Sequence, residues 1–445
     1  DGAYSLLGLV HTIAPPGIRE YIAAAATAPL QPWDALVCTS PAVVDGLNNM
    51  FEAYGEHLNE RFGGARRPRP HLPLVPLGVD LADLAAKADR PEARARIRAE
   101  FGLSDADVMV LWVGRLSFFE KAFPQPMFRA VEEAAQAAGG KVVFVMAGWF
   151  PVEPRHREVY AQAAQAYAPS VEVRFADGND HQKVADLWAG GDIFISLVDN
   201  IQETFGITPL EAMAAGLPVV ASDWDGYRYT IEHGVQGFLI PTLSAAPGGL
   251  GTAIASPHVL LLESYQSYVG TLAQAAAVNV GKAAEALAAL IASPDLRRKM
   301  GSAGRERVRT AFDWPVVARL YAQLVEELSA IRAAHAGEAT SRISPIKGDP
   351  FEAFAHFATD VLAPDTKLSV RPGASEADLE RAQKVDLDMA FPGYRASLQD
   401  CAAMLTLIGE GATAGEVLSR FPPNQRGRLE LGLVWMAKIG LLDWL

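Results

Sequence analysis

The chain has 445 residues, half of them hydrophobic and a fifth charged, so it can supply the cores of two or three globular domains. A formal net charge of −13 argues against binding to nucleic acid or to anionic lipid, because both require clustered Lys and Arg. No apolar run has membrane-spanning length, no signal peptide is evident, and the two cysteines, Cys38 and Cys401, lie outside metal-type spacing; we therefore expect a cytoplasmic protein without a transmembrane segment.

The first 80 residues are predicted to form part of an α/β lobe. Residues 6–10 form a predicted strand that ends at His11-Thr12, and residues 35–38 form a second one. Ser40 follows the second strand and is expected to cap an amphipathic helix.

Strand and helix signals alternate through the middle of the chain. Apolar runs predict strands at 108–113, 141–147, 171–175, 193–198, 218–221 and 237–240, with predicted helices at 124–138, 155–167, 181–189 and 207–215. This order predicts an α/β fold with a parallel, doubly wound sheet that is covered by helices on both faces. Ligands of such sheets bind at the carboxyl ends of the strands. Both Gly114-Arg115 and residues 199–206 follow strands and therefore lie at that edge.

The connection at residues 243–280 is longer than the fold requires. Residues 247–251 are predicted to be a loop, and residues 259–277, with two tyrosines, are predicted to be one helix that serves as a lid or as an interface. From 282 to 332 the pattern is helical, with a break at Asp313-Trp314-Pro315, because proline interrupts a helix.

The end of the chain is predicted to be a separate module. Residues 336–349 lack periodicity and are expected to be a linker. Residues 350–445 contain predicted helices at 398–408, 414–420 and 425–439, an order similar to that of a winged-helix module. Because no basic stripe accompanies these helices, we expect protein docking or oligomerisation through this module and no DNA binding.

The most informative segment is residues 199–220. Two acids, Glu203 and Glu211, have seven residues between them, with a predicted strand before the segment and a helix that begins near Gly206. Free backbone N–H groups at a helix start attract phosphates, and a carboxylate one turn into the helix can accept two hydrogen bonds from a ribose diol. An isolated pair with this spacing is more often two solvated acids, but the flanking residues favour a nucleotide-sugar site.

Those flanks resemble the retaining glycosyltransferases of family 4, which have two facing Rossmann-like lobes in the GT-B architecture. The family motif reads Glu203-Thr-Phe-Gly-Ile-Thr-Pro-Leu-Glu211 in this chain, and Gly-Leu-Pro-Val-Val-Ala-Ser follows at 216–222. Upstream, Val-Gly-Arg-Leu-Ser-Phe-Phe-Glu-Lys at 113–121 is similar to the family's Gly-Arg-Leu…Lys segment, and Gly-Phe-Leu-Ile-Pro at 237–241 matches another family pattern.

The resemblance covers residues 4–333 and implies a domain organisation. Residues 1–80 would be a partial acceptor lobe, residues 81–335 the donor lobe with its return helix, and residues 350–445 an additional helical module. A complete first lobe has a further half before this point. Either residue 1 is not the native start or another chain supplies the missing strands, and a parallel sheet divided in this way has an open hydrophobic edge.

The resemblance also implies the site residues. His11 would lie near the reacting carbon and Glu203 would contact the hydroxyls of the transferred sugar, as the catalytic pair. Arg115 and Lys121 would bind the diphosphate, with one residue more between them than is usual in the family. The donor-binding set as a whole, which includes backbone contacts, is Gly114, Arg115, Lys121, Phe205, Gly206, Ile207 and Glu211.

The sequence therefore predicts a retaining glycosyltransferase that transfers a hexose from a uridine or guanosine diphosphate sugar to a saccharide, lipid or small-molecule acceptor. No metal or other cofactor is expected, because Lys and the helix dipole can supply the positive charge. The alternative is a donor-lobe subunit that is inactive without a partner or a missing N-terminal segment. A GT-B epimerase or phosphorylase is a third, more distant option, and the lysine region that carries the phosphorylase cofactor is not evident.

Overall fold

The computed structural model describes residues 3–64, 69–137, 140–335, 337, 342–389 and 393–445. The chain divides into two compact units, Asp1–Ser344 and Pro345–Leu445, each of which is described by itself. The boundary lies within the segment expected to be a linker, of which residues 336 and 338–341 lie outside the described residues.

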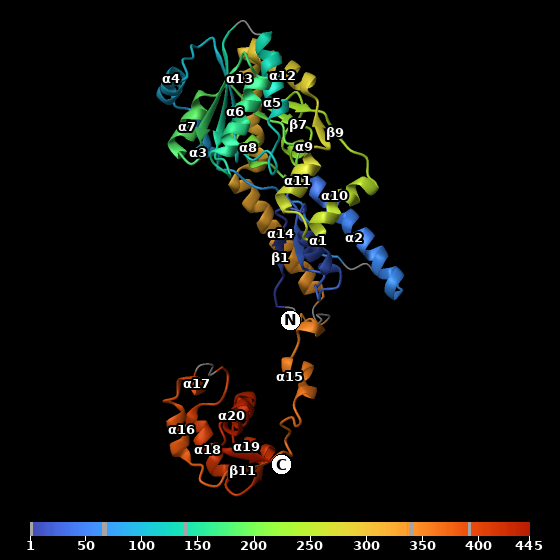
Figure 1. Cartoon of the computed structure of the whole chain (residues 1–445), viewed down its shortest axis with the longest axis vertical. Coiled ribbons are helices and arrows are strands. Elements are labelled where there is room, and N and C mark those ends of the chain that lie inside the picture. Colours follow the sequence, from blue (N-terminus) through green and yellow to red (C-terminus); the bar gives the residue numbers. More distant parts are fainter. Residues whose placement is uncertain (1–2, 65–68, 138–139, 336, 338–341, 390–392) are drawn as a thin grey trace. The chain divides into compact units, whose positions relative to one another are not determined.

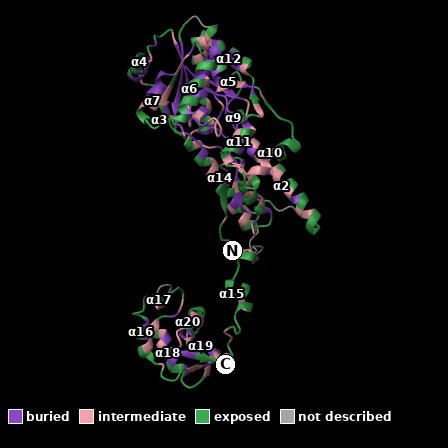
Figure 2. Cartoon of the chain, viewed as in Figure 1, coloured by how far each residue is buried: buried purple, intermediate pink, exposed green. Residues whose placement is uncertain are grey.

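A six-stranded parallel sheet forms the centre of the first unit, with strand order β5-β4-β3-β6-β7-β8. Its strands are β3 (Val108–Val113), β4 (Val142–Gly148), β5 (Glu172–Asp177), β6 (Ile193–Ser196), β7 (Val219–Ser222) and β8 (Gly237–Ile240). These strands confirm the predicted α/β class and Rossmann-like sheet, with ends that differ from the prediction by no more than about two residues. Four of the strands are almost wholly buried, as Figure 2 shows, because the sheet is covered on both faces.

Helices cover both faces of this sheet (Figure 1). One group of mutually packed helices consists of α5 (Gln125–Gln136), α6 (Arg155–Tyr167) and α12 (Val280–Ala292). The other group consists of α3 (Leu81–Ala88), α4 (Pro91–Glu100), α7 (His181–Gly190), α8 (Ile207–Ala214) and α13 (Pro294–Arg307). The four predicted helices correspond to α5, α6, α7 and α8, although residue 138 of the first prediction lies outside the described residues.

The first lobe contains β1 (Leu7–Leu9), α1 (Pro16–Ala23), β2 (Ala35–Val37) and α2 (Pro41–Phe62), and its two strands pair in parallel. The Ser40 hydroxyl oxygen accepts a hydrogen bond from the N–H of Val43 at 3.2 Å, which confirms the predicted helix cap. Leu7 and Leu9 of β1 are 44% and 51% exposed, and β2 is the only strand that pairs with β1 among the described residues.

Helix α14 (Trp314–Ala334) begins at the predicted break and returns to the first lobe. Its buried residues Val317, Leu324 and Leu328 pack in one cluster with Ala35 and Val37 of β2. A short π-helical turn, Val308–Phe312, precedes the break. The return of the terminal helix to the first lobe, expected by analogy, is therefore confirmed.

The long connection differs from the prediction of a single helix at 259–277. It contains β9 (Thr242–Ser244), α10 (Gly249–Val259), α11 (Tyr265–Ala273) and β10 (Ala276–Val278), and β9 pairs with β10 in antiparallel orientation. The chain turns at Leu261, whose φ is +60°, and Ser264 then caps α11 by accepting a hydrogen bond from the N–H of Ser267 at 3.1 Å. The predicted loop at 247–251 is also partly wrong, because α10 begins within it.

The second unit packs helices on a small antiparallel sheet of order β12-β11-β13. Its elements are α15 (Pro350–Ala353), β11 (Lys367–Val370), α16 (Glu376–Ala382), α17 (Asp386–Met389), α18 (Leu398–Ile408), β12 (Ala412–Thr413), α19 (Ala414–Leu418), α20 (Arg426–Lys438) and β13 (Leu442–Trp444). The three predicted helices correspond to α18, α19 and α20, while the sheet was not predicted. Cys401 and Met404 lie in its buried core.

A buried charge cluster attaches α4 to the central sheet. Asp192, just before β6, accepts hydrogen bonds from Arg94 and Arg98, both at 2.7 Å, and from the N–H of Met109 in β3 at 2.8 Å. The side chains of Arg98 and Asp192 are 4% and 7% exposed. The cluster therefore joins two strands and a helix at the amino edge of the sheet.

We predict that Asp192→Ala destabilises the first unit by about 3–5 kcal/mol, because it leaves a buried guanidinium without its carboxylate. The matched control is Asp295→Ala, which removes an exposed partner of Arg298 and should change stability by no more than about 0.5 kcal/mol. Urea denaturation followed by tryptophan fluorescence measures both variants. Equal midpoints for the two variants would show that the buried cluster contributes no stability.

Candidate functional site

The backbone ends of three neighbouring strands lie very close together. A Cβ atom added at Gly148, the last residue of β4, would lie 1.9 Å from the carbonyl oxygen of Gly114, which follows β3. One added at Gly178, after β5, would lie 2.7 Å from the Cα of Gly148. Only glycine fits at Gly148 and Gly178, and the result is a side-chain-free surface at the carboxyl edge of the sheet.

Two predicted site residues meet across this edge. Lys121 follows β3 and Glu203 follows β6, and the Lys121 ammonium lies 3.3 Å from Glu203 Oε2. Glu203 Oε1 accepts a hydrogen bond from the N–H of Phe205 at 3.4 Å. The Phe205 ring is buried beside Phe312, so this residue can offer a ligand only its backbone. The predicted proximity of these two loops is therefore present in the structure.

The second predicted cation is also paired with a carboxylate. Arg115 Nη1 lies 2.8 Å from Glu120 Oε2, and its guanidinium lies 5.9 Å from the centre of the Trp149 ring. Glu120 was not predicted as a site residue, although it lies within the motif at residues 113–121. Glu120 pairs with Arg115 because the loop at residues 115–121 folds back on itself, and the sequence pattern does not predict that conformation.

The start of α8 is shaped by a tyrosine. Gly206 has φ +84°, and a Cβ atom added there would lie 1.9 Å from the Tyr227 ring. A side chain at position 206 would therefore collide with this ring. No side chain in the described part of the chain caps α8, and Ile207, its first residue, is 41% exposed. The backbone N–H groups at this end are thus oriented to bind an anion.

Glu211 lies in the second turn of α8. Burial raises the pKa of its carboxyl group, and the positive charge of Lys87 partly opposes that effect. Among the described residues, its carboxylate has no hydrogen-bond or ion-pair partner, unlike Glu120 and Glu203. Glu211 is therefore free to accept hydrogen bonds from a ligand diol.

Hydrogen bonds between the lobes bring His11 to the same place. The Thr204 hydroxyl donates to the carbonyl oxygen of His11 at 2.8 Å, and the Thr39 hydroxyl donates to the carbonyl oxygen of Thr204 at 3.3 Å. The Ser40 hydroxyl donates to Asp225 Oδ1 at 2.9 Å. His11 is exposed and follows β1, so it adjoins the segment that carries Glu203. The interlobe roles of the two hydroxyl residues after β2 were not predicted.

Two further buried carboxyl groups lie in these loops. Burial raises the pKa of Asp199 to about 8, although the group accepts hydrogen bonds from the N–H of Phe123 at 3.4 Å. Burial, together with the charge of Glu203, raises the pKa of Asp225 to about 6, against the hydrogen bond from Ser40. The site therefore contains more acidic groups than cations.

Asn200 connects the two loops directly. Its side-chain amide donates to the carbonyl oxygen of Phe119 at 2.7 Å, and its side-chain oxygen accepts from the N–H of Gln202 at 2.9 Å. Its own carbonyl oxygen accepts from the indole N–H of Trp224 at 3.1 Å. This fully buried residue fixes the position of the loop that contains Glu203.

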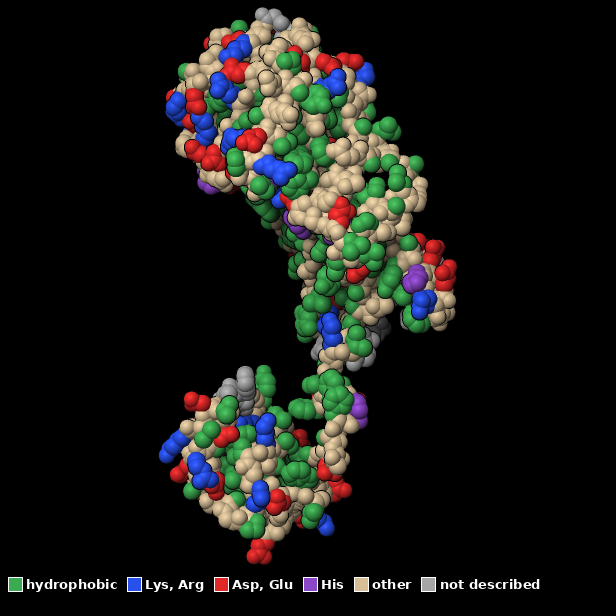
Figure 3. Space-filling model, in the orientation of Figure 1, with side chains coloured by type: hydrophobic (Ala, Val, Ile, Leu, Met, Phe, Trp, Pro, Cys, Tyr) green, Lys and Arg blue, Asp and Glu red, His purple; other side chains and the backbone are tan. Residues whose placement is uncertain are grey.

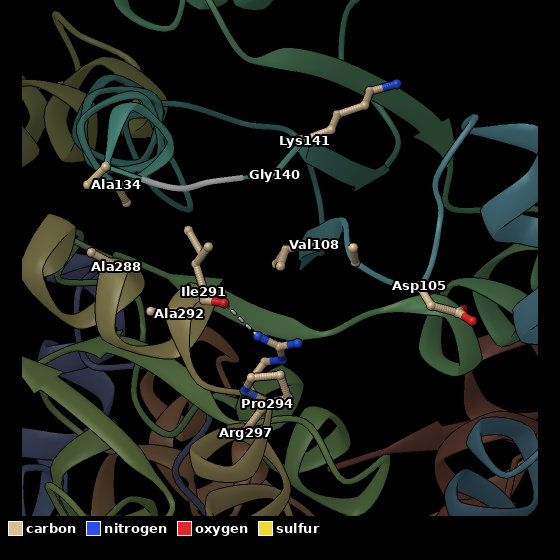
Figure 4. A pocket seen from close by; sticks show the side chains of 12 residues that line it. Asp105, Val108, Ala134, Gly140, Lys141, Ala288, Ile291, Ala292, Pro294 and Arg297 are labelled. Carbon is tan, nitrogen blue, oxygen red and sulfur yellow. Dashed lines mark hydrogen bonds between the residues drawn. The ribbon is translucent and has the colours of Figure 1, made fainter.

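A hollow of about 300 Å³ lies at the amino ends of β3 and β4, beside Val108 and Lys141, where Arg297 donates to the carbonyl oxygen of Ile291 at 3.0 Å (Figure 4). Ligands of parallel sheets bind at the opposite edge. Figure 3 shows Lys and Arg side chains interspersed with Asp and Glu on the visible face of the first unit.

Two absences apply to the described residues only. They contain no group of three or more His, Cys, Asp or Glu side chains placed to hold a metal ion. Nor do they contain a helix with both the length and the apolar character needed to cross a bilayer.

We predict that Asp199 makes stability fall with rising pH. The folded-state pKa of Asp199 is about 8 and exceeds the usual 3.8. The stability that the protein has with Asp199 protonated is therefore fully present below about pH 4 and is lost as the pH rises to about 8. Asp199→Asn keeps an acceptor for the Phe123 N–H and removes this titration, so the variant should be the more stable protein at pH 8, with a difference that shrinks toward pH 4. Thermal midpoints across this range test the prediction, with Asp295→Asn as an exposed control; parallel curves for Asp199→Asn and the unmodified protein would contradict it.

Known proteins resemble the part of the chain that carries this site. Residues 93–246 match the family described as Glycosyl transferases group 1. The D-inositol 3-phosphate glycosyltransferase of Nocardia farcinica is 28% identical over 179 residues, which are 40% of this chain and 37% of that protein. An uncharacterized glycosyltransferase of Methanocaldococcus jannaschii is 28% identical over 158 residues, 34% of this chain and 36% of that protein. The chain thus spans little more than a third of the length of these relatives.

Solved structures are similar at the level of the fold. Anabaena HepE in complex with UDP-glucose is 18% identical, with 73% of this chain and 72% of that chain covered and a TM-score of 0.49. Sucrose-phosphate synthase from Thermosynechococcus elongatus is 23% identical, with 73% and 68% covered and a TM-score of 0.44. The family match at 93–246 contains the paired Lys121 and Glu203 as well as Arg115 and Glu211. This part of the chain is therefore similar to the group 1 glycosyl transferases.

Proposed function

We propose that the protein is a retaining glycosyltransferase that transfers a hexose from a UDP- or GDP-linked sugar to a hydroxyl group of a saccharide, lipid or small-molecule acceptor. The observation that carries this proposal is the Lys121–Glu203 pair beside the amino end of α8, within the matched domain. Cations, free backbone N–H groups and a carboxylate at one edge suit a diphosphate attached to a sugar.

The donor would lie across the carboxyl edge of the sheet. Arg115, Lys121 and the N–H of Ile207 would bind the diphosphate, and Glu211 would accept hydrogen bonds from the ribose. The glycine surface at Gly114 would allow the nucleotide to approach the backbone closely. Because the leaving diphosphate gains negative charge in the transition state, these fixed positive groups would lower the barrier without a metal ion.

Glu203 and His11 would act at the sugar. Glu203 is largely buried and its negative charge would stabilise the positive charge that develops on the sugar ring. His11 lies next to the segment that carries Glu203, because the Thr204 hydroxyl donates a hydrogen bond to the His11 carbonyl oxygen. Neither residue is proposed as a covalent nucleophile.

A second candidate is a donor-binding subunit that needs a partner for activity. The exposed leucines of β1 favour it, because a strand or another chain that pairs with this edge would cover them. For residues 350–445, docking or oligomerisation stays a prediction. The basic Arg426 of α20 is paired with Glu430 at 3.0 Å, which is consistent with a module that does not bind DNA.

We predict different losses for the two acids of the motif. Glu203→Gln keeps the shape and removes the charge, so turnover should fall by orders of magnitude while nucleotide affinity hardly changes. Glu211→Ala should weaken nucleotide binding, because its contacts exist before and during the reaction. His11→Ala should lower turnover alone. Kinetics of donor hydrolysis and transfer, with calorimetric titration of UDP and GDP, distinguish these effects.

Two results would count against these roles. If all three variants lost nucleotide binding equally, the separation of binding from catalysis would be wrong. If the unmodified protein bound the nucleotide but neither transferred nor hydrolysed the donor, the subunit function would replace the enzyme function.

We predict opposite effects for the members of the Arg115–Glu120 pair. Arg115→Ala should weaken UDP or GDP binding roughly ten- to a hundredfold, through loss of a charge-assisted hydrogen bond worth about 1.5–3 kcal/mol. Glu120→Gln should strengthen binding, because Glu120 competes with the diphosphate for the guanidinium and repels it. Calorimetry in chelator measures both, with the exposed Glu410→Gln as control. Weaker binding by Glu120→Gln would show that Glu120 supports the ligand instead of competing with it.

A further inference from the structure

The insertion between β8 and α12 lies against the loop that carries Arg115. The side-chain amide of Gln266, in the first turn of α11, donates to Glu120 Oε1 at 3.3 Å, while Glu120 Oε2 pairs with Arg115. Further along α11, a Cβ atom added at Gly270 would lie 3.0 Å from the Cβ of Phe119. Helix α11 is therefore in direct contact with the candidate diphosphate loop.

Tyr265, the first residue of α11, has a buried polar group without a partner. Its hydroxyl oxygen is inaccessible to solvent and has no hydrogen-bond partner in the described part of the chain. A buried donor without a partner costs about 1–3 kcal/mol, so such groups in folded proteins usually mark a missing contact.

The electrostatic surroundings of this hydroxyl include both members of the Arg115–Glu120 pair. Burial, the charge of Glu120 and the neighbouring Tyr268 raise the pKa of Tyr265, and the charge of Arg115 opposes the shift. The phenol thus lies within electrostatic reach of the Arg115–Glu120 pair. Its hydroxyl therefore stays protonated at neutral pH. It can donate one hydrogen bond to a ligand or act as a weak acceptor.

The orientation of Tyr265 is determined within the insertion. The His258 ring at the end of α10 stacks on Tyr268 with 5.1 Å between ring centres and an angle of 12°, and lies 5.8 Å from the Tyr265 ring. His258 Nδ1 is 3.0 Å from the carbonyl oxygen of Glu263. This aromatic cluster holds α10 and α11 together, so the hydroxyl is positioned without help from the donor loop.

We propose that Tyr265 is a donor-binding residue whose hydroxyl donates a hydrogen bond to an oxygen of the diphosphate bound by Arg115, and that α11 forms one wall of the donor site. The proposal rests on the proposed function. Gln266 adds to it: when Arg115 turns from Glu120 to the diphosphate, Glu120 keeps the hydrogen bond from Gln266 and is not left without a partner. The insertion then supplies both the Tyr265 hydrogen bond to the diphosphate and the Gln266 amide that keeps Glu120 hydrogen-bonded.

The test is calorimetric titration of UDP and of GDP into the full chain and its variants. Tyr265→Phe removes only the hydroxyl and should weaken binding of the preferred nucleotide roughly tenfold, the lower range for a hydrogen bond to a charged group. In the double variant with Arg115→Ala, the total loss of affinity should be smaller than the product of the two single losses, because both residues contact the same diphosphate. Tyr394→Phe, at an exposed tyrosine of the second unit, is the matched control and should bind like the unmodified protein.

Thermal midpoints of the same variants separate binding from folding. Tyr265→Phe should be at least as stable as the unmodified protein, because it no longer buries an unpartnered hydroxyl. Unchanged affinity in Tyr265→Phe, alongside the loss in Arg115→Ala, would overturn the role of Tyr265 and leave the proposed function intact. A lower thermal midpoint that accompanies weaker binding would assign Tyr265 to structure and also overturn it. If the unmodified protein bound neither UDP nor GDP, the proposed function itself would fail, and this inference with it.

Discussion

Acidic and basic groups share the carboxyl edge of the central sheet, and the arrangement of the surrounding loops depends on how these charges are compensated. Arg115 pairs with Glu120 and Lys121 pairs with Glu203, while the buried Asp199 and Asp225 have raised pKa values. Each cation is therefore held in place by a carboxylate of the chain itself. Under the proposed function, an anionic ligand at this edge would exchange with these carboxylates, so its binding would rearrange existing ion pairs.

This exchange gives the site a basis for selectivity. A neutral sugar offers nothing that competes with a carboxylate for a guanidinium, whereas a diphosphate offers several charged oxygens. The amino end of α8 adds donors that no side chain in the described part of the chain satisfies. Under the proposed function, a ligand would present its anionic part between α8 and the Arg115 loop and its other groups to Glu203 and Glu211.

Much of the central sheet could be predicted from the sequence, because its strands are buried on both faces and appear as continuous apolar runs. The motif residues follow those runs directly, so their convergence at one edge follows from the parallel topology, and the Lys121–Glu203 contact agrees with it. The insertion was mispredicted because Val259–Ala277 has a helical composition, although Ser264 is a good helix cap and marks the start of α11. Glu120 and Tyr265 could not be connected, since they are distant in sequence and meet only through the packing of α11 on the Phe119 segment.

Helix α11 also reaches the other side of the cleft. Tyr268 lines a hollow of about 490 Å³ together with Ile13, Arg19 and Met50 of the first lobe and Ile201 of the second. Gln266 and Gly270 of this helix thus lie against the Arg115 loop, and Tyr268 lies against the interlobe hollow.

The two places where the chain passes between the lobes are joined to each other. The N–H of Val79 donates to the carbonyl oxygen of Phe312 at 2.9 Å, the N–H of Trp314 donates to the carbonyl oxygen of Val79 at 3.1 Å, and Gly78 leaves no room for a side chain beside the Trp314 ring. The two crossings are thus bonded to each other, and the hydroxyls of Thr39, Ser40 and Thr204 form three further hydrogen bonds between the lobes. Three such bonds contribute about 0.5–1.5 kcal/mol each to the contact between the lobes. If the proposed function holds, product escape that requires these bonds to break would compete with the chemical step as the event that limits the rate.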